Sequence, residues 1–180
     1  MTYRQDLWEV AAANHGVVTI TDAEDAGVPA VEVRKLAHRG ALRAYGQGVY
    51  AHLNVPPTAT TQLAVAAAMA GEAAFLQRET VLDLHDLGQL NPHRVRVATH
   101  RRVRRTLPDW IDIEHRADIA GTDLTEYSGV RATTVRRALH DLGDRMSPDR
   151  WRTLVAQATR RELISEQEAS ALLRHRWPAA

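Results

Sequence analysis

The chain contains no cysteine and a single lysine, Lys35. The first absence excludes disulfides, thiol catalysis, and the zinc or iron–sulfur sites that need cysteine ligands. No apolar run approaches the length of a membrane span, and the charged, amphipathic N-terminus lacks the pattern of a signal peptide. These absences predict a cytoplasmic protein with no membrane segment.

The chain also lacks a large excess of positive or negative charge, because its formal net charge is only +1 over 180 residues. Any binding of nucleic acid must therefore depend on a local basic patch, with a modest salt dependence set by few phosphates. Residues 1–54 carry slightly more acid than base, yet their basic residues cluster on one expected helix and the ribbon after it. The length suits one mid-sized domain or two small ones.

Residues 20–51 have the pattern of a winged helix-turn-helix, which is a DNA-reading device. A short helix capped by Thr21 or Asp22 is expected to end at Gly27. Pro29 suits the entry to a second helix, where its missing N–H costs nothing. The segments ALRAY and VYAHL then predict two strands of a hairpin, joined by a three-residue connection, Gly-Gln-Gly.

The second helix is expected to have one apolar face and one basic face. Val33, Leu36, Ala37 and Gly40 fall at helical spacing and should point inward. The basic residues that should point outward are Arg34, Lys35, His38 and Arg39. Such a face alone is commonly just solvated, or part of a protein–protein module. Its combination with the turn and the Gly-x-Gly ribbon favours contact with DNA.

The remaining sequence predicts a second domain of mixed structure. A Pro/Thr-rich joint at 54–60 is expected to separate a domain at residues 1–54 from one at residues 58–180. Helices are expected at about 60–70 and 77–87, and strands at 94–98, 111–115 and near 123–127. Three further helices should start near Thr133 or Thr134, at Ser147, and at Ser165 with its capping-box partner Glu168. The predicted fold class is α+β: an N-terminal winged helix-turn-helix domain, followed by a mixed helical C-terminal domain with a small β-sheet.

The polar residues form no recognisable catalytic set. No His-x-x-x-His pair lies on a helix, and although His85, His93, His100 and His115 could converge, surface positions are the commoner outcome for such histidines. Pro108-Asp109 and Glu114-His115-Arg116 loosely resemble a nuclease signature, in which two acids hold magnesium and a lysine lies near the attacking water. Here an arginine takes the lysine position and does not readily release a proton. We therefore predict no enzyme, no metal site and no cofactor, and expect Asp112 and Glu114 to point outward from a strand.

A second basic cluster lies in the loop between the two strands at 94–98 and 111–115. Its members are Arg101, Arg102, Arg104 and Arg105. Three interpretations stay open for this loop: a solvated surface, a second contact with the DNA backbone, or a docking patch for an acidic partner.

Several segments together resemble one family. They are the Gly-Gln-Gly-Val-Tyr turn at 46–50, the segments LQRETVL at 76–82 and LHDL at 84–87, and GVRATTVRRALHDL at 129–142. In order and spacing, over nearly the whole chain, they are similar to the AbiEi family of antitoxins of toxin–antitoxin systems.

The resemblance implies a regulator whose N-terminal domain binds inverted repeats in its own promoter and represses the operon. It implies a C-terminal domain that neutralises a nucleotidyltransferase-type toxin, in many cases without a stable complex. The DNA-reading role then falls on the four basic residues of the second helix, and Arg43, Tyr45 and Gln47 match the wing. Two alternatives remain: a plain winged-helix transcriptional regulator whose second domain senses a ligand or dimerises, and a nuclease.

Overall fold

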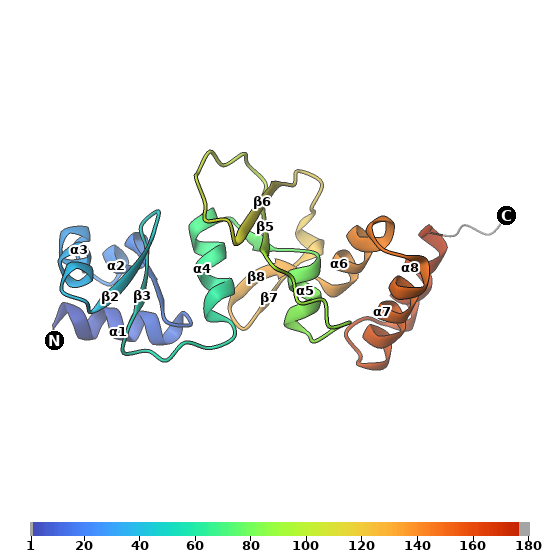
Figure 1. Ribbon diagram of the computed structural model, residues 1–180, viewed down its shortest axis with the longest axis horizontal. Coiled ribbons are helices and arrows are strands. Elements are labelled where there is room, and N and C mark those ends of the chain that lie inside the picture. Colours follow the sequence, from blue (N-terminus) through green and yellow to red (C-terminus); the bar gives the residue numbers. More distant parts are fainter. Residues whose placement is uncertain (1, 177–180) are drawn as a thin grey trace. The chain divides into compact units, whose positions relative to one another are not determined.

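The computed structural model describes residues 2–176 and confirms the α+β class (Figure 1). The chain forms two compact units. The N-terminal unit comprises Met1–Ala74 with Ser128–Val130, and the C-terminal unit comprises Phe75–Tyr127 with Arg131–Ala180. Within the described residues, every helix is too short or too polar to cross a bilayer.

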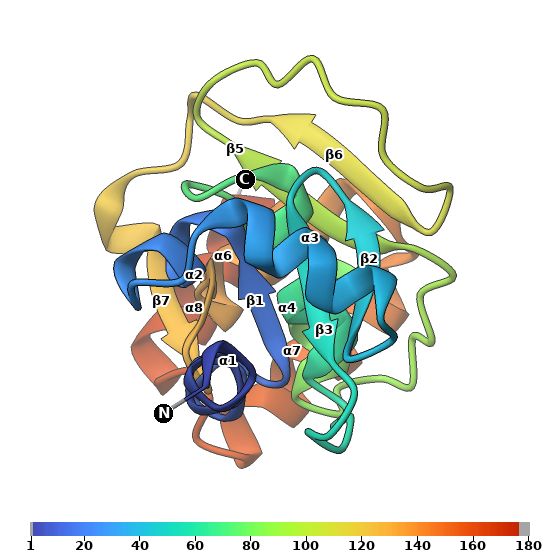
Figure 2. The same ribbon diagram turned by 90° about the vertical axis from the view of Figure 1, so that its left-hand side faces the viewer.

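The N-terminal unit contains the predicted winged helix, with α2 and α3 followed by the β2–β3 ribbon (Figure 2). Its elements are α1 (Tyr3–Ala13), β1 (Val17–Thr19), α2 (Ile20–Asp25), α3 (Ala30–His38), β2 (Leu42–Gly46), β3 (Val49–His52) and α4 (Thr61–Ala70). The three strands form an antiparallel sheet in the order β1-β3-β2. Strand β1 was not predicted, because three residues are too few to show alternation.

The predicted cap of α2 was wrong. Thr19 is the N-cap: its side chain accepts a hydrogen bond from the backbone N of Asp22, at 3.1 Å. The Asp22 carboxylate in turn accepts one from the backbone N of Thr19, at 2.9 Å, which completes a capping box. Pairing of β1 with β3 carries the chain directly into the helix at Ile20, so Thr21 is already helical.

The core of this unit lies beneath α1, α2 and α3. Its buried members are Leu7, Ala11, Val18, Ala23, Val28, Val33 and Leu42. Leu36 and Ala37 pack at the margin of this core, as predicted. Gly40 is exposed, contrary to prediction, because α3 ends at His38 and Gly40 lies in the following turn with a φ of +75°.

The Pro/Thr-rich joint at 54–60 connects β3 to α4. Helix α4 contacts all three strands of the N-terminal sheet, and the compact unit extends through Ala74. The predicted domains at 1–54 and 58–180 are segments expected to fold independently, which is a different property from compactness. That division therefore stays a prediction.

The C-terminal unit is built on a mixed sheet in the order β6-β5-β4-β8-β7. Its strands are β4 (Phe75–Leu76), β5 (Val95–Thr99), β6 (Ile111–His115), β7 (Leu124–Tyr127) and β8 (Val130–Thr133). Its helices are α5 (Glu79–Leu84), α6 (Val135–Leu142), α7 (Pro148–Arg160) and α8 (Glu166–Arg176), with 3-10 turns η1 (Gly121–Asp123) and η2 (Gly143–Arg145). β5 pairs in parallel with β6, while β4 runs antiparallel to β5 and parallel to β8.

A network of arginines and carboxylates crosses this unit. The Arg116 guanidinium donates to Asp118 at 2.8 Å, to Asp141 at 2.9 Å and to the Gln77 side-chain oxygen at 2.8 Å. Arg137 also donates to Asp141, at 2.9 Å. Burial alone would raise the pKa of Asp141, but these two arginines hold that pKa below its ordinary value. The network links the ends of β4 and β6 to α6.

Candidate DNA-binding surface

Helix α3 presents the four predicted basic side chains to solvent. Arg34, Lys35, His38 and Arg39 are all exposed, while Val33 on the opposite side is fully buried. Pro29 immediately precedes the helix as its N-cap, with a φ of −61° that fits the start of a helix. The apolar spacing that buries Val33 therefore also determines which side chains point outward.

One of the four basic side chains has a partner within the helix. The Lys35 ammonium lies 2.8 Å from a carboxylate oxygen of Glu32, three residues earlier. Among residues 2–176, no hydrogen bond or ion pair engages the side chains of Arg34, His38 or Arg39. These three side chains are available to an external anion without first breaking an intramolecular bond.

The wing differs in detail from the prediction. Gly46 belongs to β2 and pairs with Val49, so the connection has two residues, Gln47 and Gly48, where three were expected. Both have positive φ, +55° and +77°, as a tight hairpin turn of the I′ kind requires. The pairing shifts between Ala44 and Gly46, which leaves Tyr45 as the extra residue of a β-bulge.

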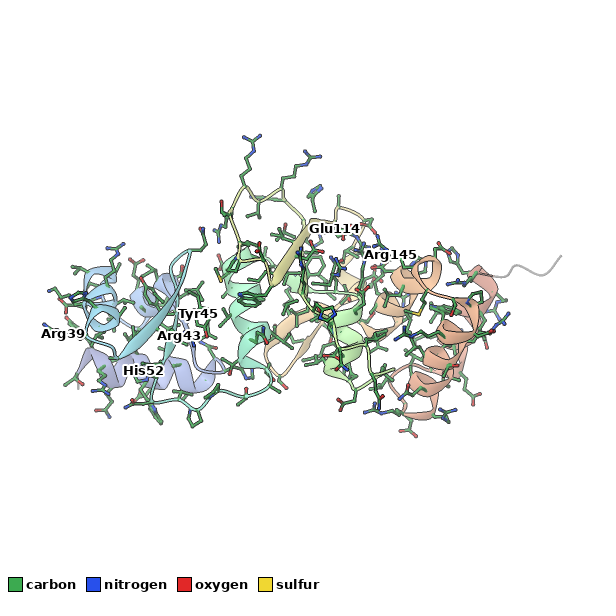
Figure 3. The ribbon with its side chains drawn as sticks, viewed as in Figure 1. Arg39, Arg43, Tyr45, His52, Glu114 and Arg145 are labelled. Carbon is green, nitrogen blue, oxygen red and sulfur yellow. The ribbon has the colours of Figure 1, made fainter. Side chains whose placement is uncertain are left out.

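The bulge brings two predicted wing residues together. The Arg43 guanidinium lies over the Tyr45 ring, 5.3 Å from its centroid, which is a cation–π distance. Figure 3 shows both side chains on β2, and Arg39 at the end of α3. At the tip of the wing, a Cβ on Gly46 would lie 3.8 Å from the Met69 methyl of α4, so exposed Gln47 lies close to this helix. The exposed positive charge of the wing is that of Arg43, which lies on strand β2.

The second basic cluster lies in the C-terminal unit, in the loop that joins β5 to β6. All four of its arginines are exposed: Arg101, Arg102, Arg104 and Arg105. The base of the loop is tied down, since the Thr99 hydroxyl donates to the Arg101 carbonyl at 2.6 Å. His115 and the His100 carbonyl form a second tie at 3.0 Å. These two hydrogen bonds hold the start of the loop in place, next to its exposed arginines.

The two strand acids near the nuclease-like pattern, Asp112 and Glu114, are paired with arginines. Glu114 accepts a hydrogen bond from Arg78 at 2.9 Å, and Asp112 is ion-paired with Arg96. Burial would raise the pKa of Glu114, but Arg78 and Gln77 lower it below its ordinary value. No three or more histidines and acids among the described residues are placed to hold a metal ion. This arrangement does not favour the nuclease alternative.

Val31 is a surface residue that the sequence reasoning missed. Val31 is 51% exposed, whereas Val33, the other valine of α3, is fully buried. It lies three residues before Arg34 and four before Lys35, so helical spacing puts it on the basic face. That spacing was a signal in the sequence, overlooked because only charged residues were considered.

The N-terminal part of the chain resembles a known family. Residues 5–51 match the family described as transcriptional regulator, AbiEi antitoxin. This match spans α1 to β3 and confirms the predicted resemblance for this segment, while the resemblance of the later segments stays a prediction. The crystal structure of the RV2827C protein from Mycobacterium tuberculosis is similar over 96% of this chain and 71% of that chain, with 18% identity and a TM-score of 0.49. No curated protein matches the chain.

Neutralising Glu32 is expected to strengthen DNA binding. In Glu32→Gln the Lys35 ammonium loses its carboxylate partner and can turn toward a phosphate. An exposed ion pair is worth about 0.2–1 kcal/mol, which corresponds to a gain in affinity of about 1.4- to fivefold. Fluorescence anisotropy with a labelled duplex measures the gain, which should diminish as salt is added. Glu166→Gln, an exposed acid in the first turn of α8, serves as the control. Equal affinities for the two variants would contradict the expectation.

The N-terminal unit is expected to lose stability in mild acid because of His52. This side chain is 2% exposed, and its Nδ1 accepts a hydrogen bond from the backbone N of Asn54 at 3.2 Å. Desolvation lowers the pKa of His52 below 6.5, and this outweighs a hydrogen bond with the Arg4 backbone that raises the pKa, while the Arg4 charge lowers it further. The unfolded chain therefore binds a proton more readily than the folded one as pH falls below about 6.5. Stability is fully present above that pH and decreases below it, by up to about 1.4 kcal/mol per pH unit.

Urea unfolding at pH 7.5 and pH 5.5 measures this loss. His52→Gln should show a smaller difference between the two midpoints than the unchanged protein. His38→Gln, at an exposed position on α3, should keep the full difference. A full pH difference that survives in His52→Gln would show that another group is responsible.

Proposed function

We propose that this protein is the antitoxin of a toxin–antitoxin operon, that it binds inverted repeats in its own promoter, and that it represses the operon. The observation that carries the proposal is the exposed basic face of α3, within a winged helix whose sequence matches the AbiEi regulators. Its site of action is the cytoplasm, where promoter DNA is accessible.

In this proposal α3 enters the major groove and the wing lies along the neighbouring phosphates. Arg34, Lys35, His38 and Arg39 contact base edges and phosphates from the helix. Arg43, Tyr45 and Gln47 are the contacts of the wing. The cation–π pair supports a positioning role for β2, because it holds the Arg43 guanidinium in one orientation before DNA arrives.

The C-terminal unit is proposed to neutralise a nucleotidyltransferase-type toxin, with or without a stable complex. Its exposed basic loop, Arg101, Arg102, Arg104 and Arg105, is then either a docking patch for acidic groups of the toxin or a second contact with the DNA backbone. A variant with all four arginines changed to serine separates the two roles, because it affects growth rescue in the first case and DNA affinity in the second.

Two measurements test the proposal. A gel shift with the DNA upstream of its own gene should show binding at moderate salt, and a footprint should protect paired half-sites. Co-expression with the adjacent gene should relieve the toxicity of that gene's product. Absence of binding to the upstream DNA at moderate salt would refute the repressor, and absence of growth rescue would refute the antitoxin.

The second candidate is a plain transcriptional regulator whose C-terminal unit senses a ligand or dimerises. It is favoured by one observation: the AbiEi match ends at residue 51 and leaves the C-terminal unit outside it. The presence of a neighbouring nucleotidyltransferase gene, toxic alone and harmless with this protein, decides for the antitoxin. Its absence decides for the plain regulator.

A further inference from the structure

Helix α3 exposes one large apolar side chain at the N-terminal end of its basic face. Val31 is 51% exposed and lies on the side of the helix opposite buried Val33. Residues three and four apart are neighbours on a helix surface, so Val31 lies against Arg34 and Lys35. It is also in the first turn of the helix, one residue after Ala30. An aliphatic group at this place contributes nothing to the core and nothing to attraction for phosphate.

The position and chemistry of Val31 match one feature of DNA. The first residues of a recognition helix are those that reach base edges in the major groove. The apolar group that the major groove presents there is the 5-methyl of thymine, which aliphatic side chains contact. Arginine or lysine at the same place would contact guanine or phosphate instead. Resting on the proposed function, we propose that Val31 selects thymine in each half-site by packing against its 5-methyl group.

The neighbouring cations support this role. Arg34 has no intramolecular partner among the described residues, so it can contact the DNA beside Val31 and exclude water from the methyl contact. The Lys35 ammonium lies 2.8 Å from a carboxylate oxygen of Glu32, which is three residues earlier, so it is turned back toward the start of the helix. A short aliphatic side chain between them can therefore approach a base edge closely.

Deoxyuridine provides the test, because it differs from thymidine only by the missing methyl group. Duplexes that bind the full-length protein are first enriched from a random pool, and each thymine of the enriched duplex is then replaced by deoxyuridine in turn. For the unchanged protein, one replacement in each half-site should weaken binding about fourfold, the value of one buried methyl group. Val31→Ala should bind the thymine duplex several-fold more weakly and should be indifferent to the same replacement.

Leu53→Ala is the matched control, since Leu53 is an equally exposed aliphatic residue of the same unit and lies outside α3. It should keep the full penalty for deoxyuridine. The inference is overturned if Val31→Ala keeps that penalty too, or if no thymine in the enriched duplex responds to loss of its methyl group. If no duplex is enriched at all, the proposed function fails and the inference fails with it, which is a result distinct from the other two.

Discussion

Arg116→Ala is expected to lower the urea midpoint of the C-terminal unit far more than any surface substitution. The Arg116 side chain is 7% exposed and donates to Gln77, Asp118 and Asp141. Its removal leaves the Asp141 carboxylate, whose side chain is 6% exposed, with fewer donors in a place that water does not reach. Breaking a buried pair in this way costs about 3–5 kcal/mol. Arg137 still contacts Asp141, so we expect the lower end of that range.

Tryptophan fluorescence during urea unfolding measures the effect. Trp151 is fully buried in the C-terminal unit, and its indole N–H donates to the Leu139 carbonyl at 2.8 Å, so its emission changes when this unit opens. Arg145→Ala is the control, because Arg145, labelled in Figure 3, is exposed and its side chain makes no ion pair or hydrogen bond within residues 2–176. Coincident midpoints for the two variants would show that the network around Arg116 does not stabilise the unit.

The double substitution Arg34→Ala and Arg39→Ala is expected to reduce affinity for the operator about a hundredfold, given about 1–3 kcal/mol for an arginine that reads a base and less for a phosphate contact. Both guanidinium groups are exposed on α3 and have no partner among the described residues. Loss of two cations should also reduce the slope of log K against log salt concentration by up to about 2. Stability should change little, because exposed side chains that hold no contact contribute little to folding.

Anisotropy titrations at several salt concentrations measure both the affinity and the slope. The control replaces Arg150 and Arg174, exposed arginines on α7 and α8, and should leave both quantities unchanged. Circular dichroism confirms that the variants are folded. An unchanged affinity and slope in the α3 variant would remove this helix from the interface.

Elements with a complete local pattern could be predicted from the sequence. Strand β6 was predicted with its observed bounds, because Ile111 and Ile113 alternate with polar residues. The start of α8 was predicted from Ser165 and Glu168, whose reciprocal hydrogen bonds need only four consecutive residues. The outward basic face of α3 was predicted on the same grounds, from helical spacing around Val33.

Features that depend on distant residues could not be predicted. Thr19 and Thr21 are equally suitable as caps of α2, and only the pairing of β1 with β3 selects Thr19. The short strand β4 has no alternation of its own, and it exists because β5 and β8 flank it. Two partners of Arg116, Gln77 and Asp141, are 39 and 25 residues away along the chain, so the sequence could not show that they meet it.

The two units also differ in when their stabilising contacts can form during synthesis. The apolar cluster of the winged helix lies between Leu7 and Val55, whereas the network of the C-terminal unit joins Gln77 to Asp141. Ribosomes extend a chain from its N-terminus at about 5–20 residues per second, and domains fold as they emerge. We therefore expect the winged-helix cluster to form on the nascent chain before α6 has left the exit tunnel. A messenger RNA truncated between the codons for Val55 and Asp141 yields a polypeptide that contains the basic helix α3 but lacks Asp141. We expect the incomplete C-terminal unit of that polypeptide to stay unfolded and to be degraded by proteases.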